Sequence, residues 1–240
     1  MCYLVQARAA TPAHHALKLR ALIFDFDGLI VDTETPLLRS WQEVFEHWSV
    51  PIDEGQLARL VEYEREPPEA YRLLQAALGG RLDADIVRRV RAAREAELIA
   101  REPATPGLRE LLRDAREAGV RTAIASNSRL DWIGPLLHRL HLASAFDTVR
   151  CRDNVQKVKP DPQLYLAVLE DLGLQRDEAI AFEDAPAGAQ AARRAGIFCV
   201  AVPNPATAGL SWGSVDDRIP SLASTSIPRL NALLEQRTHG

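Results

Sequence analysis

The sequence is poor in the residues that stabilise secreted or membrane-spanning proteins. It has three cysteines in 240 residues, and Cys2, Cys151 and Cys199 lie far apart without a CxxC pair. This spacing argues against a disulfide framework and against a cysteine zinc site, and it favours a reducing compartment. No apolar run approaches the roughly 20 residues that a membrane-spanning helix needs. The first residues also lack the pattern of a signal peptide. We therefore predict a cytoplasmic protein with no membrane contact.

An excess of positive charge is absent as well. The chain has 29 basic and 33 acidic side chains and a formal net charge of −4, so no electrostatic surface for nucleic acid is predicted. Hydrophobic residues make up 47% of the chain and charged residues 26%. These values are typical of a globular protein with one large or two modest domains. We expect a monomer, with a dimer left open.

One short stretch near the start combines a buried strand with two acids. Residues 21–24 form an uncharged apolar run, and Asp25 and Asp27 follow it directly. Residues two apart on an extended strand point to the same side, so these acids would share one site. Two close carboxylates repel each other unless a cation or a shared proton intervenes. Gly28 then permits a sharp turn or a close approach to a ligand. The stretch predicts a site rather than a simple polar turn.

The segment after this stretch predicts helices only. Apolar residues recur at helical spacing over 36–48, 57–64, 69–78 and 83–101, and no strand pattern interrupts them. Prolines at 103 and 106 close the segment. We predict an all-helical domain, residues 35–103, inserted after the first strand.

From residue 105 onward the pattern alternates between helix and strand. Strands are predicted at 120–125, 146–149, 179–182 and 198–202, with a last edge strand at 219–222. Helices are predicted at 108–118, 131–140, 162–172, 186–195 and 227–234. This alternation indicates an α/β fold, a doubly wound Rossmann-like parallel sheet covered on both faces. Its core would comprise residues 20–34 and 104–240, after a poorly ordered N-terminal extension of residues 1–19.

Polar side chains stand where the predicted strands end, which is where such sheets bind ligands. Each has a plainer explanation when taken alone. A serine often caps a turn, a lysine is usually solvated, and paired acids favour a helix N-terminus. Together they suit one task. Clustered carboxylates suit Mg²⁺, a hydroxyl and an ammonium suit phosphate oxygens, and an aspartate can attack phosphorus. The residues concerned are Asp25, Asp27, Ser126, Asn127, Lys159, Glu183 and Asp184.

Four segments resemble, in order, the four motifs of the haloacid dehalogenase-like hydrolase superfamily. They are Asp25-Phe-Asp-Gly-Leu-Ile-Val-Asp-Thr-Glu, Ala125-Ser-Asn-Ser, Val158-Lys-Pro-Asp-Pro and Phe182-Glu-Asp-Ala-Pro-Ala-Gly. The resemblance covers the chain after residue 20. It points to the subfamily with a small helical cap, which includes phosphoglycolate phosphatase-like and β-phosphoglucomutase-like members.

The resemblance implies a role for each motif residue. Asp25 would be the nucleophile that forms an aspartyl-phosphate, and Asp27 the general acid and base. Mg²⁺ would be held by Asp25, the backbone carbonyl of Asp27 and Asp184, with Glu183 binding directly or through water. The phosphoryl group would be held by Ser126, the backbone N–H of Asn127 and Lys159. Gly28 would belong to the hinge of the cap. The expected activity is Mg²⁺-dependent hydrolysis of a small phosphorylated metabolite.

Three other activities compete with this interpretation. A dehalogenase generally lacks an aspartate at the position of Asp27, so its presence disfavours that activity. A phosphosugar mutase of the β-phosphoglucomutase type would carry a histidine where Leu37 stands, which weakens the mutase case. A non-catalytic phosphoryl-binding module would not need both Asp25 and Asp27. Cap and hinge candidates for substrate contact are Glu34, Tyr63, Arg65 and Arg72.

Overall fold

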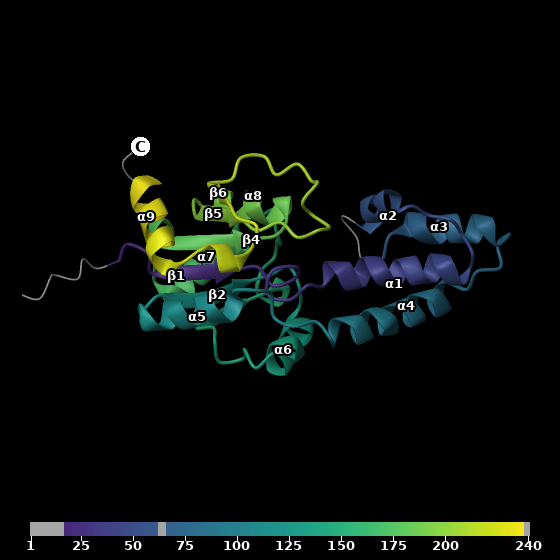
Figure 1. Ribbon diagram of the computed structural model, residues 1–240, viewed down its shortest axis with the longest axis horizontal. Coiled ribbons are helices and arrows are strands. Elements are labelled where there is room, and N and C mark those ends of the chain that lie inside the picture. Colours follow the sequence, from purple (N-terminus) through teal and green to yellow (C-terminus); the bar gives the residue numbers. More distant parts are fainter. Residues whose placement is uncertain (1–16, 62–65, 238–240) are drawn as a thin grey trace, which may run out of the picture.

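The structure is a computed structural model that describes residues 17–61 and 66–237. A sheet with helices on both faces forms one part of the molecule, and a group of four helices extends from it (Figure 1). The strands are β1 (Ala21–Phe24), β2 (Arg121–Ala125), β3 (Thr148–Arg150), β4 (Ala179–Glu183), β5 (Phe198–Ala201) and β6 (Asp217–Arg218). The helices are α1 (Glu34–His47), α2 (Glu54–Val61), α3 (Pro68–Ala77), α4 (Ala84–Ile99), α5 (Leu108–Glu117), α6 (Leu130–Arg139), α7 (Gln163–Leu172), α8 (Pro186–Arg194) and α9 (Ile227–Arg237).

The strands of the described residues form a single sheet in the order β3-β2-β1-β4-β5-β6. All neighbouring pairs are parallel. β1 lies in the interior of the sheet, and its four residues are fully buried. The chain runs outward from β1 through β2 and β3, then returns to β4 on the other side of β1. The predicted doubly wound α/β fold is confirmed.

Alternate residues of the central strands pack against helices on opposite faces of the sheet. Leu22 and Phe24 of β1 belong to the core formed with α5, α6 and α9. Ala21 and Ile23 belong to the core formed with α7 and α8. The ring of Phe24 stacks on that of Phe182 in β4, with centroids 5.2 Å apart. Both faces of β1 are therefore dry, and the strand can hold the residues that follow it in a fixed position.

Helices α1–α4 lie between β1 and α5 in the sequence, and in space they form a separate block to one side of the sheet (Figure 1). The block has its own apolar core, which includes Leu37, Trp41, Phe45 and Leu74. Its described residues contain helices and no strand, as the spacing predicts. The limits of the block as a domain, 35 and 103, remain a prediction.

Two edges of the sheet differ from the prediction. β6 is formed by Asp217–Arg218 and not by residues 219–222. The N–H of Ile219 still donates to the Ala201 carbonyl at 2.9 Å, but Pro220 has no N–H and ends the ladder. β3 begins at Thr148 rather than at Phe146, because the N–H of Thr122 in β2 donates to the side chain of Asp147, at 2.8 Å, and not to a backbone carbonyl of this segment.

The structure describes only the last residues of the predicted N-terminal extension, and the limits of that extension, 1 and 19, remain a prediction. Leu19 is fully buried, and its N–H donates to Asn231 Oδ1 at 3.0 Å, which ties it to α9. Residues 1–16 lie outside the described residues. Within the described part of the chain, none of the helices combines the length and the apolar character needed to cross a bilayer.

Candidate active site

β1 and β4 bring acids from two distant segments side by side. The register pairs Phe24 with Phe182, and the N–H of Asp25 donates to the Phe182 carbonyl at 3.0 Å. The pairing thus continues to the first acid, next to the end of β4 at Glu183. Asp184 follows directly. Because the strand order reverses between β1 and β4, this is the crevice where an open α/β sheet binds its ligands.

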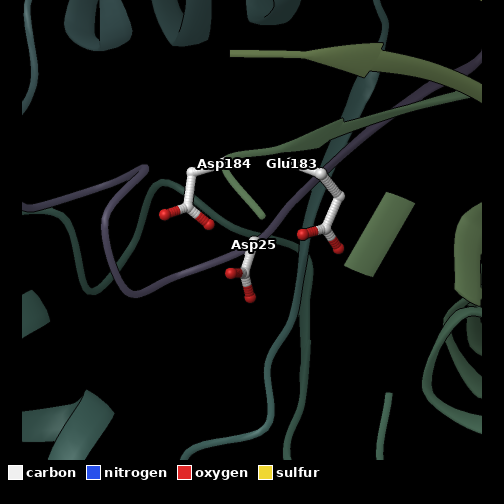
Figure 2. A group of neighbouring side chains, drawn as sticks. All are labelled: Asp25, Glu183 and Asp184. Carbon is white, nitrogen blue, oxygen red and sulfur yellow. The ribbon is translucent and has the colours of Figure 1, made fainter. Parts of the chain in front are cut away.

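Asp25, Glu183 and Asp184 form a carboxylate cluster. Each offers an oxygen, and these oxygens all lie within 4.8 Å of one another. Figure 2 shows the three side chains converging from the ends of β1 and β4. Glu183 and Asp184 are buried, and the side chain of Asp25 is 14% exposed. A compact set of carboxylate oxygens without sulfur or imidazole fits Mg²⁺, which keeps waters and binds through few protein carboxylates.

A buried ammonium lies against two of these acids. Lys159 Nζ is 2.6 Å from Asp25 Oδ1 and 2.7 Å from Glu183 Oε1, and its side chain is 3% exposed. The hydroxyl of Tyr165 also donates to Glu183. The ammonium of Lys159 therefore balances only part of the negative charge that the three acids carry when ionised, in a largely buried site.

Burial is the main influence on the protonation of the cluster. It raises the pKa of Glu183 to about 7, against the opposing effect of Lys159. Burial also raises the pKa of Asp184 well above its ordinary value, and the charges of Asp25 and Glu183 add to it. The pKa of Asp25 is raised by burial too, although Lys159 lowers it. Burial lowers the pKa of Lys159, but Asp25 and Glu183 raise it by more. A divalent cation would reverse the rise at the acids.

The end of β2 holds the loop that carries Lys159. Asn127 Oδ1 accepts from the N–H of Lys159 at 2.8 Å, and Asn127 Nδ2 donates to its carbonyl at 3.3 Å. The sequence predicts a backbone role for Asn127, and its side chain adds this link. Ser126 is 1% exposed, and its Oγ accepts from the N–H of Ser128 at 3.0 Å. The predicted phosphate-binding residues therefore lie on connected segments.

Asp27 has a different set of partners from Asp25. Its Oδ1 accepts from Trp132 Nε1 at 2.9 Å, and its Oδ2 accepts from the hydroxyl of Ser128. Both donors follow β2, whereas Asp25 accepts from Lys159 in the loop before α7. The two acids that the sequence places in one site therefore have separate hydrogen-bond partners, although the charge of Asp27 still raises the pKa of Asp25.

Several polar partners of the site lie outside the residues that sequence reasoning selected. Asn204 Nδ2 donates to Asp184 Oδ2 at 2.8 Å, while its Oδ1 accepts from the N–H groups of Ala206 and Thr207 at 2.9 and 3.1 Å. The turn after β5 thereby orients the amide toward the acid. Trp132 and Tyr165 are further examples. Aromatic side chains usually contribute to apolar cores, and no spacing in the sequence marks these two as partners of acids.

Gly28 is required by the closeness of the backbone to Asp184. Its φ is +72°, and an added Cβ would lie 2.1 Å from Asp184 Oδ2. Gly119 has a similar φ of +70°, with nothing within 4 Å of an added Cβ. Alanine at position 119 is expected to cost about 1 kcal/mol of unfolding free energy. Alanine at position 28 is expected to cost about 3 kcal/mol, because Asp184 is displaced as well.

Urea unfolding of Gly28→Ala and Gly119→Ala measures this difference, and calorimetric titration with Mg²⁺ shows whether binding weakens in the first variant alone. Equal losses of stability in the two variants would contradict crowding at Asp184.

The cap and hinge candidates differ in their relation to the cluster. Glu34 begins α1, and its Oε1 accepts from the Thr33 hydroxyl at 3.3 Å. Its charge contributes to the raised pKa of Asp184, so it lies near the acids. Arg72 is 71% exposed and pairs with Glu69 within α3 at 2.8 Å, so the structure does not bring it to the cluster. Tyr63 and Arg65 lie outside the described residues.

Comparison with known proteins gives a consistent family. The family profile described as haloacid dehalogenase-like hydrolase matches residues 22–202. YhcW of Bacillus subtilis is 35% identical over 221 residues, which cover 88% of this chain and 96% of that protein. The fructose-1-phosphate phosphatase YqaB of Escherichia coli is 32% identical over 193 residues, with 75% and 95% covered. The crystal structure of CbbY from Rhodobacter sphaeroides in complex with phosphate has a TM-score of 0.62 and 26% identity, with 85% and 95% covered.

Proposed function

On the premise that the chain belongs to the haloacid dehalogenase-like hydrolase family, we propose that it is a Mg²⁺-dependent phosphatase of a small phosphorylated metabolite. The observation that carries the proposal is the contact of Lys159 with the carboxylate cluster. It places a site suited to Mg²⁺ next to an ammonium group that can bind phosphate. The similarity to a fructose-1-phosphate phosphatase and to a phosphate-bound structure supports it.

The proposed reaction has two displacement steps. Asp25 attacks the phosphorus atom of the monoester, so that a bond to its carboxylate forms as the bond to the leaving oxygen breaks. Asp27 gives its proton to that leaving oxygen. Water then attacks the aspartyl-phosphate and gives a proton to Asp27. Inorganic phosphate leaves, and Asp25 is regenerated as a free carboxylate.

The remaining residues would bind and neutralise the phosphoryl group. Ser126, the backbone N–H of Asn127 and Lys159 would contact its non-bridging oxygens. Asp25, the backbone carbonyl of Asp27, Glu183 and Asp184 would hold Mg²⁺. The ion would supply positive charge to the phosphoryl oxygens and to the nucleophile.

The competing activities fit the residues less well. Asp27 is a proton donor that a dehalogenase would not need. Leu37 stands where a mutase of this family carries histidine, and it is 1% exposed within the core of the helical block. A non-catalytic binding module would not need a nucleophile and an acid together. We therefore retain hydrolysis, with water as the final acceptor.

We propose that residues 35–103 act as a cap over a core of residues 20–34 and 104–240. The cap would select the leaving group by closing over the cluster. Glu34 lies at the junction of the two parts and near Asp184. Among the described residues, it is our candidate for linking the movement of the cap to the carboxylate cluster.

Phosphate release tests the proposed function. p-Nitrophenyl phosphate and a panel of sugar and short-chain metabolite monophosphates are incubated with the protein and Mg²⁺, or with EDTA. We expect release with Mg²⁺, a decrease of at least about 100-fold with EDTA, and recovery when Mg²⁺ is added in excess. Release that chelation does not change, or no release from any substrate, would contradict the proposal. Conversion of glucose 1-phosphate to glucose 6-phosphate would favour the mutase instead.

A further inference from the structure

The Asp27 carboxylate is held at both oxygens by side chains that no motif assigns to it. Trp132 Nε1 donates to Oδ1 at 2.9 Å, and the Ser128 hydroxyl donates to Oδ2. Both donors are neutral, so the two contacts fix the direction of the carboxyl group without adding a counter-charge. An indole N–H can only donate, which makes Trp132 a partner of defined geometry.

The indole is itself held by the start of α6. The N–H of Leu130 donates to Asp153 Oδ2 at 2.9 Å, and Arg129 pairs with Asp153 Oδ1 at 3.2 Å. Further along the helix, Ile133 is buried against the sheet, and Trp132 packs at the edge of the same apolar core. The start of this helix is therefore tied to the preceding loops, and the indole reaches Asp27 from a supported position.

We propose that Trp132, assisted by Ser128, is a positioning residue that holds Asp27 where it meets the leaving oxygen. The inference rests on the phosphatase activity proposed above. It assigns to α6, outside the four motifs, a part in the first displacement step. Its effect must then depend on the substrate. A monoester with a poor leaving group needs the proton of Asp27, whereas p-nitrophenolate leaves without one.

A comparison of leaving groups separates positioning from packing. The value of kcat/KM covers the steps up to the first irreversible one, which includes transfer to Asp25 and excludes the later attack of water. We expect Trp132→Phe to lower kcat/KM for an alkyl monophosphate about 10- to 100-fold, and to lower it for p-nitrophenyl phosphate less than about threefold. Ser128→Ala is expected to show the same selectivity. Trp48→Phe, at a site 40% exposed in the helical block, is the matched control and is expected to change neither value.

A decrease of equal size for both substrates would overturn the proposal, because loss of packing does not distinguish leaving groups. A wild-type protein without phosphatase activity would instead reject the proposed function.

A nuclear magnetic resonance measurement tests the contact without any turnover. The chain has four tryptophans, and the indole signal that Trp132→Phe removes identifies Trp132. We expect Asp27→Asn to shift that signal and to leave the other indole signals in place. A Trp132 signal that does not move would overturn the contact, and with it the inference, even if Trp132→Phe proves unstable.

Discussion

Asp25→Asn is expected to release phosphate at least about 10⁴-fold more slowly than the wild type, because an amide is a poor nucleophile for phosphorus. The amide is close to the carboxylate in size, so the fold is expected to survive. Rapid acid quenching of the wild type with substrate is expected to trap a phosphoryl group on Asp25, which peptide mass spectrometry locates. The same quench of the variant is expected to show none.

A matched control for this variant is Asp177→Asn. Asp177 is 60% exposed and pairs with Lys18 at 3.6 Å, away from the cluster. Its activity is expected to equal that of the wild type. Substantial activity in Asp25→Asn, with deamidation excluded by intact mass, would contradict the nucleophilic role. A phosphoryl group trapped on another residue would do so as well.

Lys159→Met is expected to show the largest loss of stability. The substitution keeps the length and apolar stem of the side chain but removes the ammonium from Asp25 and Glu183. Breaking a buried ion pair on one side typically costs about 3–5 kcal/mol. Phosphate release is expected to fall about 10³-fold as well, because the phosphoryl group loses a cation.

The stability of this variant without metal is expected to depend on pH. Glu183 has a pKa of about 7 in the folded protein and an ordinary value of 4.5, with Lys159 already lowering it. Without Lys159 the folded value rises further. At pH values between the unfolded and the folded pKa, Glu183 keeps a proton in the folded protein and loses it in the unfolded chain. The free energy of unfolding therefore falls as pH rises through this interval. The loss of unfolding free energy in Lys159→Met relative to the wild type is therefore expected to be small near pH 4.5 and to reach its full size above the folded pKa of Glu183.

Urea unfolding in EDTA at several pH values measures this effect. Lys157→Met is the control, since Lys157 is exposed in the same loop, and its stability is expected to follow that of the wild type at each pH. A difference between Lys159→Met and wild type that stays constant with pH would contradict the electrostatic explanation.

The convergence of the acids could be predicted because it depends on a simple rule of sheets. Apolar runs identify the strands, and the carboxyl ends of parallel strands meet at one edge. Asp25, Ser126 and Glu183 each stand at such an end, so their common location follows without knowledge of any side-chain contact. The helical block could be predicted equally well, because its apolar residues keep helical spacing throughout.

The hydrogen-bond partners of the acids could not be predicted in this way. Trp132 and Asp27 are 105 residues apart, and Asn204 and Asp184 are 20 apart. Such contacts depend on the angle at which a helix or turn meets the sheet. The start of α6 shows the same limit. The sequence predicts a helix from residue 131, but α6 begins at Leu130, whose N–H donates to Asp153, 23 residues away.

The way in which helices α1–α4 join the sheet has a consequence for how this protein can change. Val31 and Ala104 form an antiparallel bridge, and the N–H of Thr105 donates to the Ile30 carbonyl at 3.0 Å. The exit and the return of the chain therefore lie side by side. Helices α1–α4 are thus an insertion whose two ends are adjacent. Replacing them with another segment would change the chain at two neighbouring points and leave the sheet intact. Recombination can thus exchange the helical block while the acids of the sheet are inherited unchanged.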